Sequence, residues 1–78
     1  MKARLTLTGN VQGVGFRWFA RKRAIKLGIR LLQAENKPDG RTLVLEIEGV
    51  LVPVQNFIAW AKRGPASSKV ENADIIYW

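Results

Sequence analysis

Residues 3–28, ARLTLTGNVQGVGFRWFARKRAIKLG, hold a strand pattern, a glycine-rich segment and a helix pattern in succession. Apolar and polar residues alternate over residues 3–8, which is the period of a half-buried strand. The glycines of residues 9–15 end that alternation and predict a loop. Residues 16–27 follow a helical period, and Gly28 stands where a helix commonly ends. The apolar side chains of this helix are expected to share one stripe, formed by Phe16, Phe19, Ala20, Ala24 and Leu27.

A hairpin is predicted after this helix. Residues 30–36 and 41–48 are predicted to be strands, and Lys37-Pro38-Asp39-Gly40 joins them. Proline presets φ in such a turn and glycine accepts the positive φ that closes it, so Pro-Asp-Gly is a strong turn sequence. The two segments are therefore expected to pair.

The last third of the chain predicts a second helix and a final strand. Pro53 suits the first position of that helix, and Gly64-Pro65 ends it. Residues 70–77 are predicted to form the final strand, whose alternation slips around Asn72-Ala73 and indicates a bulge. The resulting order, β-α-β-β-α-β, predicts an α+β, ferredoxin-like fold, with a four-stranded antiparallel sheet and both helices on one face.

The composition restricts the chemistry that this chain can perform. Its 78 residues predict a single domain over residues 1–78. It has no Cys and no His, which excludes thiolate nucleophiles and removes the usual general base and the commonest metal ligand. No apolar run approaches the roughly 20 residues of a membrane span, so we expect neither a span nor a signal peptide, and a cytoplasmic location. The net charge of +7 favours encounters with anions such as phosphorylated metabolites, nucleic acids or acidic membranes.

The segment from Gly9 to Arg17 is the candidate for chemistry. Backbone N–H groups between the end of a strand and the start of a helix can converge on an anion, helped by the positive end of the helix dipole. Gly13 and Gly15 let the backbone come close to an oxyanion, and Arg17 could grip two phosphate oxygens with its planar fork. The same residues also suit a plain strand-to-helix connection, in which the glycines serve the turn and Arg17 is solvated.

The run Val11-Gln12-Gly13-Val14-Gly15-Phe16-Arg17 resembles, letter for letter, the signature of the acylphosphatase family. The resemblance spans essentially the whole chain and agrees with the predicted order of helices and strands. Further residues of the family pattern follow in order: Gly28, Asn36-Lys37-Pro38-Asp39-Gly40, Glu48-Gly49, Phe57 and Gly64-Pro65.

The resemblance implies metal-free hydrolysis of small acyl phosphates to a carboxylate and orthophosphate, without a cofactor. It implies that Arg17 and the backbone N–H groups of residues 12–17 bind the phosphoryl group, and that Asn36 orients the attacking water. A carboxylate leaves readily without a general acid, so positioning and electrostatic stabilisation suffice. The expected partners are the acyl phosphate and inorganic phosphate, as product and inhibitor, with no membrane partner, and the chain is expected to be a monomer. The implied phosphate-binding residues are Gln12, Gly13, Val14, Gly15, Phe16 and Arg17, and the implied catalytic residues are Arg17 and Asn36.

One segment departs from the family pattern. From Gly28 to Asn36 the chain is one residue longer than the family's Gly-Leu-x-Gly-Trp-Val-x-Asn, and from Asn36 to Gly49 it is also one residue longer. Side chains alternate along a strand, so one added residue would turn Asn36 to the wrong face. Either a bulge or a longer loop absorbs the added residue, or the amide is misplaced. One extra residue on each side of the hairpin could also lengthen it and leave the turn intact.

Two other functions remain open. The first is a weak or inactive phosphate-binding or regulatory module, including a piece of a larger hydrogenase-maturation carbamoyltransferase, in which similar domains occur. The second is a nucleic-acid-binding domain, which the basic residues Arg21, Lys22, Arg23 and Lys26 would serve. RNA-binding sheets of this type stack bases on aromatic residues of their central strands, and no such pair occurs here. We therefore favour a solvated helix face for these cations.

Overall fold

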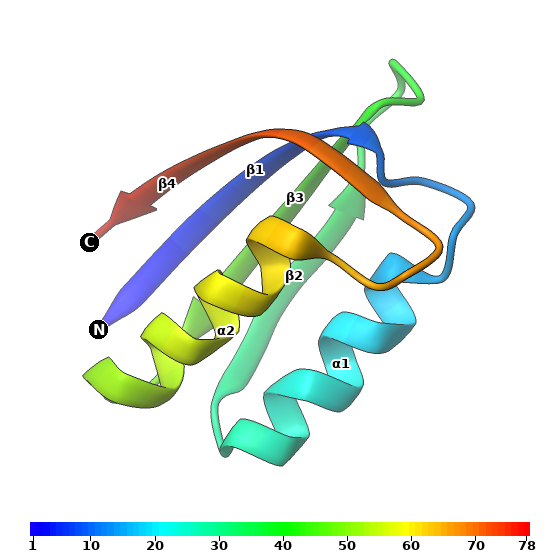
Figure 1. The fold of residues 1–78 in the computed structure, drawn as a ribbon. Helices are drawn as coiled ribbons and strands as arrows, with labels where there is room; N and C mark the ends of the chain where they lie inside the picture. The colour runs from blue at the N-terminus through cyan, green and yellow to red at the C-terminus, as the bar shows by residue number, and fades with distance from the viewer.

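The computed structural model describes residues 1–78 and has the predicted order of elements. This order is β1 (Lys2–Asn10), α1 (Phe16–Leu27), β2 (Arg30–Asn36), β3 (Thr42–Glu48), α2 (Leu51–Arg63) and β4 (Lys69–Tyr77). The four strands form one antiparallel sheet in the order β2-β3-β1-β4, and both helices cover the same face of it (Figure 1). The ferredoxin-like prediction is therefore confirmed.

The core lies between the helices and the inner face of the two central strands. Ala3, Leu5 and Leu7 of β1 lie opposite Ile47, Leu45 and Leu43 of β3, and all six side chains are completely buried. The period of two seen in the sequence thus points alternate side chains of each strand toward the helices and the others to the opposite face of the sheet. The helical side of this core consists mainly of Phe16, Ala20, Ala24, Val54, Phe57, Ile58, Trp60 and Ala61.

Two aromatic residues differ from the predicted stripes. Phe19 was expected in the core but is 40% exposed, because it leans over the start of α1, where its ring lies close to Gly15. In α2 the helical period predicts a stripe of Val54, Phe57, Ile58 and Ala61, which leaves out Trp60. Trp60 is nevertheless buried, and its ring packs edge-on against Phe16 and Phe57, with centroids 5.5 Å away in both cases. Since α2 packs against both the sheet and α1, it needs a wider apolar face than a single stripe provides.

The second helix begins earlier than Pro53 predicted. It starts at Leu51, so Pro53 is the third helical residue and not the first. The first N–H groups of a helix have no intrahelical acceptor, and proline therefore costs no hydrogen bond at this position. Neither helix is long and apolar enough to cross a membrane.

Two bulges interrupt the pairing of the edge strands. In β4, Asn72 pairs with Thr8 and Val70 pairs with Gly9, so the residue between them has no partner. The predicted bulge is present, one residue before the expected position. In β2, Leu31 pairs with Ile47 and Gln33 pairs with Glu46, which leaves Leu32 as the additional residue.

The β2–β3 turn is held by the Asp39 carboxylate. It accepts hydrogen bonds from the Thr42 hydroxyl at 2.6 Å and from the N–H groups of Arg41 and Thr42 at 2.8 and 2.9 Å. The hydroxyl, followed by the Arg41 N–H, holds the pKa of Asp39 below its usual value. Because the folded state lowers this pKa, the stabilisation is complete above the usual pKa and is lost as the pH falls through the lowered one.

Candidate active site

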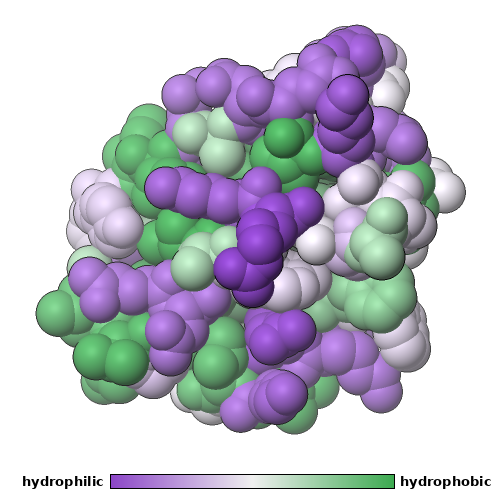
Figure 2. Space-filling model, in the orientation of Figure 1, coloured by the Kyte–Doolittle hydropathy of each residue, from purple (hydrophilic) through white to green (hydrophobic).

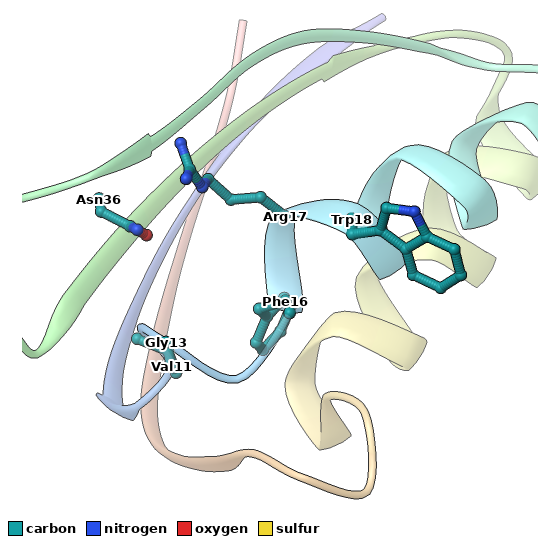
Figure 3. A pocket seen from close by; sticks show the side chains of 7 residues that line it. Val11, Gly13, Phe16, Arg17, Trp18 and Asn36 are labelled. Carbon is teal, nitrogen blue, oxygen red and sulfur yellow. The ribbon is translucent and has the colours of Figure 1, made fainter.

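A hollow of about 190 Å³ lies between the β1–α1 loop, the first turn of α1 and the end of β2. Asn36 closes it on the β2 side, although it is far from the loop in sequence (Figure 3). The lining residues are Val11, Gly13, Gly15, Phe16, Arg17, Trp18 and Asn36. The structure thus brings together five of the residues selected from the sequence: Gly13, Gly15, Phe16, Arg17 and Asn36.

The loop that borders this hollow has unpaired backbone donors. Gly13 and Gly15 have φ values of 70° and 75°, in the left-handed region that residues with a Cβ rarely adopt. A Cβ on Gly13 would meet no atom within 4 Å, so this glycine is needed for its backbone conformation and not for space. The N–H groups of residues 12–17 donate to no acceptor in the protein. Such donors before a helix form a concave site for an anion.

Arg17 supplies a positive charge that no carboxylate neutralises. Its side chain extends from the first turn of α1 toward β2 and the Asn36 amide (Figure 3). The four ion pairs of the structure all use other cations, and α1 contains no acidic residue. The guanidinium is exposed and its N–H groups are available to a ligand in the hollow.

The Leu32 bulge decides the direction of Asn36. Leu31, Ala34 and Asn36 are the partly buried members of β2, and Asn36 pairs with the fully buried Leu43. Regular alternation from Leu31 would have put Gln33 and Glu35 on this face and turned Asn36 away. The bulge therefore absorbs the residue added between Gly28 and Asn36, and Asn36 lies on the same face as Leu31 and Ala34.

The Asn36 amide has no partner in the protein. Its Oδ1 atom is buried and accepts no hydrogen bond. A buried acceptor without a donor costs about 1–3 kcal/mol. Native structures tolerate such groups mainly at sites where a water molecule or a ligand is to be held.

Gln12 and Val14 do not line the hollow. The Gln12 side chain points to the hairpin, where Nε2 donates to the carbonyl oxygens of Lys37 at 2.7 Å and Thr42 at 3.0 Å. The Val14 carbonyl accepts a hydrogen bond of 2.8 Å from the Ser67 hydroxyl in the α2–β4 loop. Both residues thus hold the loop in place. In these two residues the backbone N–H group, and not the side chain, remains a candidate for anion contact.

Val11 and Trp18 line the hollow but are not among the phosphate-binding and catalytic residues predicted from the sequence. Val11 directly follows β1, and its buried side chain anchors the beginning of the loop in the core. Trp18 is 58% exposed, and its indole points away from Asn36 along the outside of α1 (Figure 3). The sequence signal for Trp18 as a lining residue is its position outside the apolar stripe of α1, directly after Arg17.

The family model described as Acylphosphatase matches residues 3–78. The chain belongs to the acylphosphatase family. It is 40% identical over 75 residues to the acylphosphatase of Thermococcus kodakarensis, covering 96% of this chain and 80% of that protein. It is 43% identical over 67 residues to the acylphosphatase of Thermus thermophilus, covering 86% and 74% of the two chains.

Two solved structures have the same fold over this chain. The Bacillus subtilis acylphosphatase superposes with a TM-score of 0.86 at 33% identity, covering 96% of this chain and 81% of that one. Full-length HypF, in its phosphate- and nucleotide-bound form, superposes with a TM-score of 0.73 at 28% identity, covering 96% of this chain but 10% of HypF. Family and fold together support acyl phosphate hydrolysis as the activity of the chain.

Proposed function

We propose that the chain hydrolyses small acyl phosphates without a metal, holding the phosphate in the loop of residues 12–17 and the attacking water on Asn36. The observation that carries this proposal is the convergence of unpaired groups on one hollow. The loop N–H groups, the Arg17 guanidinium and the Asn36 amide all lack protein partners there.

The phosphoryl group is held by charge-assisted hydrogen bonds. The loop N–H groups surround its oxygens, and Arg17 binds two of them with parallel N–H donors. These donors are fixed by the fold before the substrate arrives, so they stabilise the spreading charge of the transition state without reorganising.

The water attacks phosphorus from its place on Asn36. The new bond joins the water oxygen to phosphorus, and the bond between phosphorus and the acyl oxygen breaks. An acyl phosphate dianion and water then give a carboxylate and dihydrogen phosphate, so both protons of the water remain on the phosphate product. No side chain has to accept a proton, which suits a chain without histidine.

The decisive experiment measures benzoyl phosphate hydrolysis in the presence of EDTA, with inorganic phosphate as inhibitor. We expect the rate to be unchanged by EDTA and competitive inhibition by phosphate. No three His, Cys, Asp or Glu side chains gather where they could hold a metal ion. A rate that depends on an added divalent cation would contradict metal-free hydrolysis.

A second candidate function is phosphate binding without turnover. It is favoured by the similarity to a small part of full-length HypF, a protein much longer than this chain. The same experiment separates the two functions, because a module of this kind would bind phosphate but leave benzoyl phosphate intact.

Gln12 is expected to position Asn36 from a distance. Its two hydrogen bonds join the phosphate loop to Lys37 and Thr42, which adjoin Asn36 and its partner Leu43. Gln12→Met keeps the shape but removes both donors. We expect kcat to fall about tenfold or more, because small displacements of a reacting group are costly, while phosphate inhibition changes little.

The control for this variant is Gln33→Met, since the exposed Gln33 amide bonds only to Glu35. If Gln12 acts through Asn36, adding Gln12→Met to an Asn36→Ala protein should change kcat less than about twofold. An equal loss of kcat from Gln12→Met in the wild-type and in the Asn36→Ala protein would show that Gln12 acts on the loop alone.

Deletion of Leu32 tests the role of the bulge. Without this residue, the Leu31–Ile47 and Gln33–Glu46 pairs become consecutive, and Asn36 keeps its face. Leu32 is 38% exposed and belongs neither to the core nor to the partly buried side chains packed against it, so its loss leaves the core unchanged. We expect hydrolysis to change less than about threefold, which corresponds to a minor surface change. A folded deletion protein, verified by thermal unfolding, that has lost hydrolysis would refute this account of the bulge.

A further inference from the structure

The candidate active site continues into a second hollow along α1. This hollow, of about 290 Å³, is lined by Arg17, Trp18, Arg21 and Ala34, and it shares Arg17 and Trp18 with the first. Arg21 and Ala34 also line a third hollow farther along α1 and β2. Overlapping linings make these hollows one groove that starts at the phosphate loop.

Arg21 brings a second free guanidinium into this groove. It follows Arg17 by one helical turn, a rise of about 6 Å along the axis. Like charges at this spacing repel each other, and α1 has no acidic residue to offset them. Glu35, Glu46, Glu48 and Glu71 pair with other cations, and Asp39 is engaged in the turn. An anion between or beside the two guanidiniums would relieve this repulsion.

Two other cations of α1 lie against aromatic rings and line none of the three hollows. The Lys22 ammonium lies 5.2 Å from the Trp18 ring centroid, and the Arg23 guanidinium lies 5.4 Å from that of Trp60. Figure 2 shows long hydrophilic side chains crossing this helical face with apolar surface between them. Apart from Arg17, Arg21 therefore supplies the only guanidinium that lines the second hollow. One guanidinium can bind one carboxylate through two parallel hydrogen bonds.

We infer that Arg21 binds a carboxylate at the far end of the acyl group, so that acyl phosphates of dicarboxylic acids are the preferred substrates. This inference rests on the proposed function, because the transferred phosphate has to occupy the loop beside Arg17. Trp18 and Ala34 supply the apolar part of the lining of the same hollow, and this lining suits a short carbon chain. Arg21 thus sets specificity and takes no part in the bond changes at phosphorus.

The test compares butanoyl phosphate with butanedioyl phosphate, which have the same chain length and differ in the terminal carboxylate. We expect kcat/KM to be higher for butanedioyl phosphate. In Arg21→Gln the ratio of the two kcat/KM values should fall about fivefold, as much as an ion pair at a solvent-accessible site can supply. The matched control is Lys26→Gln, which removes the same charge from an exposed residue of α1 that lines none of the three hollows.

The outcomes separate the two proposals. An unchanged ratio in Arg21→Gln, or an equal fall in Lys26→Gln, would overturn the carboxylate site while leaving hydrolysis established. A wild-type protein that hydrolyses neither substrate would overturn the proposed function and, with it, the preference assigned to Arg21.

Discussion

Replacing Arg17 with alanine is expected to lower kcat/KM for benzoyl phosphate by about 10³-fold or more. The guanidinium has no ion-pair partner, so its whole charge is available to the phosphoryl oxygens. Its loss removes two charge-assisted hydrogen bonds from the ground state and from the transition state. Hydrolysis should become undetectable, and inhibition by inorganic phosphate should weaken in the same variant.

Two further variants make this result specific. Arg30→Ala removes the same charge from an exposed residue at the opposite end of β2, and should leave hydrolysis close to that of the wild type. Arg17→Lys restores a point charge without the fork and should recover only part of the rate. Full activity in Arg17→Ala would exclude Arg17 as the phosphate clamp.

Replacing Asn36 with alanine is expected to lower kcat by about 10²-fold or more, the loss typical of a positioned hydrogen-bonding group at a reacting centre. Inhibition by inorganic phosphate should stay nearly intact, because the loop N–H groups and Arg17 are untouched. The same change removes a buried oxygen that accepts no hydrogen bond. The free energy of unfolding should therefore be unchanged or higher, in contrast to the usual loss at a partly buried position.

The measurements for Asn36 are turnover, phosphate inhibition and denaturant unfolding on the same preparation. A purely structural asparagine would lose stability and activity together. An unchanged turnover number would show that another group orients the water.

The order of elements was predictable because each carries a local signal. The strand of residues 2–10 alternates with period two, glycines end α1 and α2, and Pro-Asp-Gly makes the β2–β3 turn. The resemblance in residues 11–17 was also local, and these residues do gather at one hollow with Asn36.

Other features depended on tertiary contacts that no local pattern encodes. The bulge at Leu32 lies in Leu31-Leu32-Gln33, where two adjacent leucines give no indication of which one faces the core. Trp60 is buried because α1 packs beside α2, and the direction of the Gln12 side chain depends on the distant hairpin. The sequence therefore predicted which residues gather at this hollow better than it predicted how they are held.

The unpaired Leu32 also bears on how relatives of this chain should be aligned. β2 borders the sheet and has hydrogen-bonded neighbours only on its β3 side, so an extra residue disturbs one ladder and not two. Insertions and deletions in β2 that a bulge absorbs can therefore accumulate during divergence without turning the Asn36 amide to the other face of the sheet. Counting positions between the loop signature and the asparagine would then reject functional homologues, whereas comparing which side chains point inward would retain them.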